Sequence, residues 1–198
     1  MIPKNLTNPF LSSWIFAFFL CHTSFGQSDN PRFEVGRRLV EMEKNLEKNL
    51  HQDSLKKICP ILKPLTFQFF AGQMESIARS LDQANQALSN NQSPSKAELF
   101  ADSLCMDISP KLIAFDSSEL SIGINSCYKS ANSPSLNAEL ICESAQEKVW
   151  YSESIVIRDL PLKMKIKTTS TPSGKSTISL VVKQNNLVIK RHSYAIWK

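Results

Sequence analysis

Residues 149–198 read VWYSESIVIRDLPLKMKIKTTSTPSGKSTISLVVKQNNLVIKRHSYAIWK, and this stretch decides the fold that the sequence predicts. Apolar and polar residues alternate along four segments, which is the pattern of strands with one buried face. The segments cover 149–158, 162–169, 175–183 and 187–197. The stretches between them are rich in turn-forming residues: Asp159-Leu160-Pro161, Pro172-Ser173-Gly174 and Asn185-Asn186. Residues 148–198 are therefore expected to form an antiparallel β meander.

The turn at Gly174 gives the most specific local expectation. Proline and serine at its first two positions suit a type I turn, and Gly174 can adopt the left-handed conformation that closes a three-residue loop. A hairpin closed by this turn places Ile166 opposite Leu180, so that apolar side chains face each other across the two strands.

The sequence before this stretch is mainly helical. Apolar residues recur at spacings of three and four over 33–107, as on the buried face of an amphipathic helix, and Ser95 with Glu98 forms a capping box. A short hairpin is expected over 111–125, followed by a helix over 134–147. The predicted fold class is α+β, with N-terminal helices packed on a C-terminal antiparallel β meander of about four to six strands.

The first 26 residues have the organisation of a secretory signal peptide. Lys4 gives a positive start, residues 10–20 form an apolar run, and small residues precede a cleavage site after Gly26. The run is shorter than the roughly 20 residues that span a membrane, so cleavage is favoured over a retained signal anchor. We expect a secreted or periplasmic protein without a transmembrane span in the mature chain. Residues 27–198 then form a single domain.

The cysteines after residue 26 are expected to form disulfides. They are Cys59, Cys105, Cys127 and Cys142. Outside the cytoplasm an even number of cysteines favours disulfides, and no CxxC pair points to zinc or to thioredoxin-type chemistry. Four cysteines permit three pairings. The favoured one is Cys59–Cys105 with Cys127–Cys142, because each bond would join neighbouring predicted elements.

Basic charge is concentrated in the predicted sheet. Residues 148–198 hold 10 basic and 2 acidic residues, whereas residues 27–147 hold 12 basic and 16 acidic residues. Three lysines at alternate positions share the outward face of one predicted strand, and three further basic residues on neighbouring strands could extend them into a patch. The six are Lys163, Lys165, Lys167, Lys183, Lys190 and Arg191.

Such a basic patch suits an anionic partner. The main hypothesis is an exported, non-catalytic binding protein that contacts anionic lipid, glycan or another envelope component. Nucleic acid fits the pattern poorly, because no aromatic side chains that could stack on bases are interleaved with the lysines. A structural role is the alternative interpretation, since lysines on a strand keep a sheet soluble and block edge-to-edge pairing.

Residues typical of catalysis or cofactor binding are scarce. The composition, 42% hydrophobic and 21% charged, is that of a globular protein, but five dispersed glycines exclude the glycine-rich loops that bind nucleotide phosphates. Neither a G-x-S-x-G nor an H-E-x-x-H motif is present, so no catalytic residue, metal site or cofactor is predicted. The alternative function is a small-molecule pocket protein or an enzyme, in which a cone-shaped α+β fold would bring Tyr151, Glu153 and His192 together.

Overall fold

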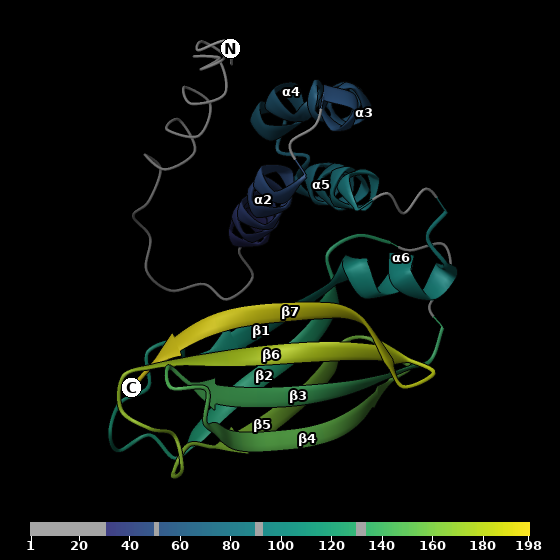
Figure 1. Ribbon diagram of the computed structural model, residues 1–198. Coiled ribbons are helices and arrows are strands. Elements are labelled where there is room, and N and C mark those ends of the chain that lie inside the picture. The colour runs from purple at the N-terminus through teal and green to yellow at the C-terminus, as the bar shows by residue number, and fades with distance from the viewer. Residues whose placement is uncertain (1–30, 50–51, 90–92, 130–133) are drawn as a thin grey trace, which may run out of the picture.

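The computed structural model describes residues 31–49, 52–89, 93–129 and 134–198, in which helices lie over two β-sheets (Figure 1). The helices are α2 (Pro31–Lys48), α3 (Gln52–Leu62), α4 (Leu65–Phe70), α5 (Met74–Leu88) and α6 (Lys96–Ser103). The strands are β1 (Leu104–Ser109), β2 (Glu119–Ser126), β3 (Leu136–Ser144), β4 (Val149–Ile157), β5 (Leu162–Lys167), β6 (Lys175–Gln184) and β7 (Leu187–Trp197). The fold is α+β, as predicted. The predicted signal peptide, residues 1–26, lies outside the described residues.

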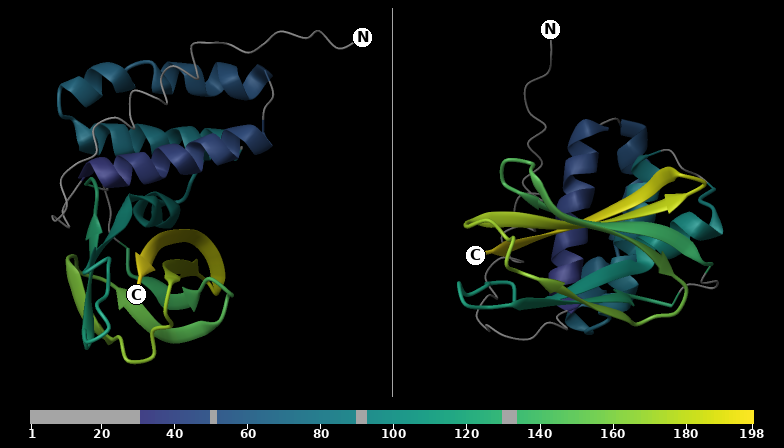
Figure 2. Two further views of the ribbon diagram at one scale, coloured as in Figure 1. Left: turned by 90° about the vertical axis from the view of Figure 1, so that its left-hand side faces the viewer. Right: turned by 90° about the horizontal axis from the view of Figure 1, so that it is seen from below.

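Antiparallel pairing arranges the strands into a sandwich of two sheets. One sheet has the order β1-β2-β5, and the other has the order β4-β3-β6-β7. Buried side chains such as Ile122 of β2 and Leu140 of β3 form the core between the sheets. The helices cover the edge of the sandwich where β1 and β7 lie, and β4 and β5 lie at the opposite edge (Figure 2).

A second core lies within the helical layer. Helices α2, α3 and α5 bury apolar side chains such as Val35 and Leu81 against one another. Helix α6 is different, because Phe100 belongs to the core of the sandwich. The capping box predicted at Ser95 and Glu98 is present at the start of this helix. Helix α6 therefore lies between the helical layer and the edge of the sandwich formed by β1 and β7.

The helix predicted over 134–147 is wrong, because Leu136–Ser144 form β3. This strand pairs with β4 on one side and with β6 on the other. Alternate residues from Leu136 to Cys142 are buried, which is the period of a strand. The Ser-Pro start and the following Ala-Glu-Leu resemble a helix start, but hydrogen bonding to two neighbouring strands outweighs that local preference.

The hairpin predicted over 111–125 is only half correct. Strand β2 occupies its second half but pairs with β1 and β5 rather than with residues 111–115. Residues 111–115 contribute one isolated bridge, to the last strand. Strand β1 occupies the end of the region 33–107 that was predicted to be helical. Alternate residues from Leu104 onward are buried, so the period changes from helical to extended at this point.

The strands predicted within 148–198 are present, with bounds close to those expected. They do not form one continuous meander, because β5 crosses to the other sheet and pairs with β2. Ile166 therefore lies opposite Leu120, and the predicted pairing with Leu180 is wrong. Ile166 is buried in the sandwich core. Pairing of β5 with β6 or with β2 would bury the same alternate residues, so the alternation along β5 does not distinguish the two partner strands.

The same substitution at two glycines is expected to have opposite effects on stability. Gly174 has φ +97°, so Gly174→Ala should lower the free energy of unfolding by about 1–2 kcal/mol. Gly36 lies within α2 with nothing within 4 Å of an added Cβ, so Gly36→Ala should raise it by about 0.5–1 kcal/mol. Chemical denaturation of both variants measures the two effects. Equal losses at both positions would contradict these backbone conformations.

Candidate functional site

Three of the predicted basic residues form an exposed row, here called the lysine row. Lys163, Lys165 and Lys167 occupy alternate positions of β5 and are exposed on the outward face of the three-stranded sheet. Strand β5 is an edge strand of that sheet. Lys165 Nζ lies 2.8 Å from a carboxylate oxygen of Glu119 on β2, and this hydrogen bond raises the pKa of Lys165. The lysine row is therefore a solvated cationic strip with one local counter-charge.

The other three predicted basic residues do not extend the lysine row. Lys183 and Arg191 belong to the four-stranded sheet. Their ion-pair partners are Glu139 and Glu143, at 2.7 and 4.0 Å respectively. Lys190 lies largely buried where β7 meets the helices. The six residues are thus divided among three parts of the molecule rather than joined in one patch.

Tyr151, Glu153 and His192, the residues of the alternative pocket, are not brought together. Tyr151 and Glu153 lie on β4, whereas His192 lies on β7 at the opposite edge of the same sheet. Glu153 is exposed and accepts a hydrogen bond from Tyr151; burial, followed by this carboxylate, raises the pKa of Tyr151 to about 12. Aliphatic side chains fill the space between the sheets, so the fold is a packed sandwich rather than a cone around a cavity.

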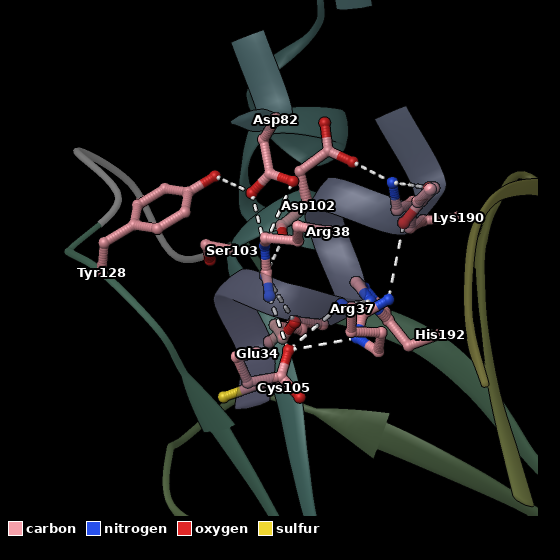
Figure 3. A network of polar contacts seen from close by, with 12 residues as sticks. Glu34, Arg37, Arg38, Asp82, Asp102, Ser103, Cys105, Tyr128, Lys190 and His192 are labelled. Carbon is pink, nitrogen blue, oxygen red and sulfur yellow. Dashed lines mark hydrogen bonds and ion pairs between the residues drawn. The ribbon is translucent and has the colours of Figure 1, made fainter. Parts of the chain in front are cut away.

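A charge network that the sequence analysis did not identify lies buried at the junction of the helices and the sandwich (Figure 3). Its centre is Arg38 of α2, whose side chain is completely buried. The guanidinium lies 3.0 Å from Asp82 of α5 and 2.6 Å from Glu34. It also donates to the carbonyl oxygens of Asp102 and Leu104, at 2.8 and 3.1 Å. One side chain thus joins α2, α5, α6 and β1.

Asp82 has a second donor besides Arg38. The hydroxyl of Tyr128 donates to its carboxylate at 2.8 Å. Burial raises the pKa of Asp82 to about 6, although the positive charge of Arg38 acts in the opposite direction. Burial, followed by the charge of Asp82, also raises the pKa of Tyr128, which keeps this hydroxyl protonated as a donor. The chain that follows β2 is thereby attached to α5.

Lys190 attaches β7 to the same network. Its ammonium group lies 2.8 Å from Glu41 of α2 and 3.0 Å from Asp102 of α6. Burial by itself would lower the pKa of Lys190, but the two carboxylates outweigh burial and the pKa rises. This lysine is a cation with two carboxylate partners and is not part of an exposed binding surface.

His192 is completely buried and has a defined tautomer. Its Nε2 lies 2.8 Å from the carbonyl oxygen of Ala101, so Nε2 carries the hydrogen and donates it. Its Nδ1 lies 3.2 Å from a guanidinium nitrogen of Arg37, which donates to it. Burial, followed by the positive charge of Arg37, lowers the pKa of His192 well below its usual value. His192 is therefore neutral and links β7 to the helices.

One signal of this network was available in the sequence. Glu34 and Arg38 lie on the same face of α2 as the apolar residues Val35 and Met42, and all four are buried. Charged residues within an apolar helical stripe indicate buried charge that needs a partner. The partners on α5, α6 and β1 are distant in sequence. The pattern therefore predicts that the buried charges have partners, but it does not identify which residues these are.

A cavity of about 690 Å³ lies beside the network. Its walls come from the first turns of α2 and α5 and from β1 and β2. The lining includes Glu34 and Met74 from the helices, and Cys105 and Cys127 from the sandwich. This volume falls in the range of small-molecule pockets. The cavity lies at a different place from the pocket that the sequence predicted, and it contains none of the three residues expected there.

Neither of the two predicted disulfides is present. All four cysteines among the described residues are free thiols: Cys59 is exposed on α3, and Cys142 is buried in the sandwich core. Cys105 and Cys127 are instead neighbours whose thiols interact, and the thiol of Cys105 donates to the carbonyl oxygen of Asn125 at 3.6 Å. The Cys127–Cys142 expectation failed because it placed Cys142 on a helix that follows Cys127, whereas Cys142 lies on β3 of the four-stranded sheet and Cys127 follows β2 of the other sheet.

Exposed apolar side chains lie on the loop after β1 and at the end of β7, which pair with each other. Leu112, Phe115 and Trp197 are 73%, 81% and 46% exposed, and together they are called the apolar end. Leu112 and Trp197 are joined by an isolated bridge. Lys175, which is exposed, lies opposite Trp197 in the register of β6 and β7. An exposed aromatic and aliphatic cluster with neighbouring lysines is a candidate interaction surface.

Removing Arg38 should be far more damaging than removing an exposed cation. Arg38→Ala leaves the carboxylate of Asp82 buried without its ion-pair partner, so it should lower the free energy of unfolding by about 3–5 kcal/mol. Lys165→Ala, which removes the exposed partner of Glu119, should change it little. Urea denaturation of the two variants gives the comparison. Similar effects at both positions would mean that the guanidinium does not hold the junction together.

His192 should make stability depend on pH. The unfolded chain binds a proton near pH 6.5 and the folded chain only well below it, so acidification below about 6.5 favours unfolding. The loss should approach about 1.4 kcal/mol per pH unit, and His192→Gln should remove it. Asp82 acts in the opposite direction, because its raised pKa favours the folded state on acidification. The difference between wild type and variant in a denaturation series at several pH values isolates His192; parallel curves would contradict its buried neutral state.

Comparison with known proteins adds no identity to this geometry. Neither the models of protein families nor the curated proteins gave a match to the sequence. Among the residues that the structure describes, no helix is long and apolar enough to cross a membrane, and no group of three His, Cys, Asp or Glu side chains is placed to hold a metal ion. The function has to be inferred from the surfaces and cavities themselves.

Proposed function

We propose that this protein is an exported binding protein that docks on an anionic lipid surface through the lysine row and the apolar end. The observation that carries the proposal is the continuity of the two features. Three exposed lysines lie along β5, and the strand ends beside exposed Leu, Phe and Trp side chains. No catalytic residue is needed for this function.

Hydrogen bonds bring the end of the lysine row to the apolar end. Thr168 follows Lys167, and its N–H donates to the carbonyl oxygen of Ser118 at 3.0 Å. Ser118 lies in the same loop as Phe115. Lys198, next to Trp197, donates to the carbonyl oxygen of Thr168 at 3.0 Å. The loop after β1, the end of β5 and the C-terminus thus meet at one place.

The combination of basic and apolar side chains favours lipid over a free polyanion. Trp and Phe side chains are suited to the boundary between headgroups and acyl chains, where burial of apolar area stabilises binding. Lysines near an anionic leaflet add an attraction that salt weakens. Stable attachment of a peripheral protein needs two such signals together. An acidic glycan would use the lysine row but would leave the apolar end in water.

Two features of the same region have to be separated from lipid binding: nearby acidic residues, and the position of β5 at the edge of a sheet. Asp116 and Glu119 are exposed there, and Glu119 is the ion-pair partner of Lys165. In addition, β5 is an edge strand, where lysines also hinder pairing with another sheet. The experiment therefore has to separate lipid binding from protection of the edge.

The test measures co-flotation of the mature chain with vesicles of phosphatidylglycerol and phosphatidylcholine, across a salt series. Substituting all three residues of the lysine row with Gln should reduce the bound fraction by about tenfold or more. Leu112→Ser with Phe115→Ser should reduce it as well, and the binding that remains should be more sensitive to salt. Vesicles of phosphatidylcholine alone should bind weakly.

A matched control changes the same charge elsewhere: Lys44→Gln, Lys48→Gln and Lys96→Gln on the exposed surface of the helices should leave binding unchanged. Equal losses in the two triple variants would reduce the effect to net charge and contradict the proposal. Self-association of the lysine-row variant with normal vesicle binding would mean that the lysines only protect the edge. If the protein is retained on a heparin-like matrix, and Leu112→Ser with Phe115→Ser does not change that retention, the ligand would be an acidic glycan instead.

A further inference from the structure

Cys105 and Cys127 are placed side by side by the register of β1 and β2. Cys105 lies opposite Asn125, and the N–H of Cys127 donates to the carbonyl oxygen of Ser103 at 2.8 Å. The two cysteines are therefore diagonal neighbours on the same face of an antiparallel pair, where side chains are within reach. The thiol of Cys105 donates a hydrogen bond to the carbonyl oxygen of Asn125 at 3.6 Å, and it also interacts with the neighbouring thiol of Cys127.

We propose that Cys105 and Cys127 are a reversible dithiol site, which forms a disulfide by exchange with a disulfide-containing molecule that enters through the cavity. Both residues line the cavity of about 690 Å³, and both are partly exposed. The cavity gives a small disulfide, or a disulfide on an extended peptide, direct access to the pair. This inference is independent of the proposed lipid binding.

The surroundings assign different roles to the two sulfurs. The interaction with the neighbouring Cys105 thiol, followed by the positive charge of Arg38, lowers the pKa of Cys127. The same interaction, followed by burial, raises the pKa of Cys105. The thiolate is the form that attacks disulfides. Cys127 is therefore the attacking residue, and Cys105 is the residue that completes the exchange.

The exchange balances without a metal or a cofactor. The Cys127 thiolate attacks one sulfur of the incoming disulfide, so that a mixed disulfide forms and the other sulfur leaves as a thiolate. Cys105 then loses its proton to solvent, and its sulfur attacks Cys127 to form the Cys105–Cys127 bond. The second thiolate of the incoming molecule leaves in this step. The protein dithiol is oxidised by two electrons, and the incoming disulfide is reduced to two thiols.

The position of the other two cysteines makes this pairing specific. Cys142 points into the core from β3, on the inner face of the four-stranded sheet. Cys105 lies on the outward face of β1, because its neighbours Leu104 and Met106 are buried inside, and Cys127, just after β2, packs against the helical core on that side. The three-stranded sheet thus separates them from Cys142. Cys59 lies on the helical layer, on α3.

The test uses the full mature chain in buffers of oxidised and reduced glutathione. Free thiols are alkylated under native conditions, and intact mass and peptide mapping then identify the bonds. In oxidised glutathione Cys105 and Cys127 should together lose two hydrogen atoms and appear in one cross-linked peptide pair, whereas the exposed Cys59 should carry glutathione. Reduced glutathione should restore both thiols. Cys59→Ser with Cys142→Ser should behave like the wild type at Cys105 and Cys127.

Cys105→Ser is the variant that separates the roles. Without the second sulfur, exchange should stop at the mixed disulfide, so Cys127 should retain one glutathione, whereas Cys127→Ser should retain none at Cys105. Circular dichroism of each variant shows whether it is folded, and the wild-type titration does not depend on any variant. A cross-link to Cys59 or Cys142, or a folded wild type in which Cys105 and Cys127 both stay alkylatable under oxidised glutathione, would overturn the proposal.

Discussion

The buried guanidinium of Arg38 is the interaction on which the junction of the two layers depends. A cation without solvent is costly unless its N–H groups are satisfied, and here two carboxylates and two carbonyl oxygens accept from it. The planar guanidinium presents five N–H donors in a fixed geometry, so one side chain reaches acceptors on α2, α5, α6 and β1. These directional hydrogen bonds therefore fix the position of the helices relative to the start of β1, which non-directional apolar contacts alone would not do.

This junction determines which surfaces remain available. Lys190 and His192 of β7 are used to hold the helices, so the edge formed by β1 and β7 is closed. The cavity with its two thiols remains beside the junction, between the first turns of α2 and α5 and the sheet. The lysine row lies along β5, at the edge that the helices leave open (Figure 2). The chain thus keeps its structural charges and its candidate binding charges on different edges of one sandwich.

The sequence pattern correctly predicted those features that depend on residues close together in the chain. The C-terminal strands and the capping box at Ser95 follow from alternation and from a hydrogen bond three residues away, and the structure confirms them. The partner of β5 could not be found in this way, because Ile166 is buried whichever sheet it joins. The same limit applies to Lys190, whose carboxylate partners lie on α2 and α6. The contact between Cys105 and Cys127 could not be predicted without the register of β1 and β2. Cys105 fell in the region predicted to be helical, so no such pairing was expected.

The crossing of β5 between the sheets has a consequence for the order of folding. The chain leaves β2 at Ser126 and returns to its side only at Leu162, after β3 and β4 have been made. The three-stranded sheet therefore cannot be completed by local hairpin formation, and such non-local pairing is slow. Until β5 arrives, one edge of β2 has no neighbouring strand, and the second sheet that covers the β1–β2 hairpin still lacks β6 and β7. The interval between the second and fifth strands is thus the stage at which the chain is most exposed to aggregation.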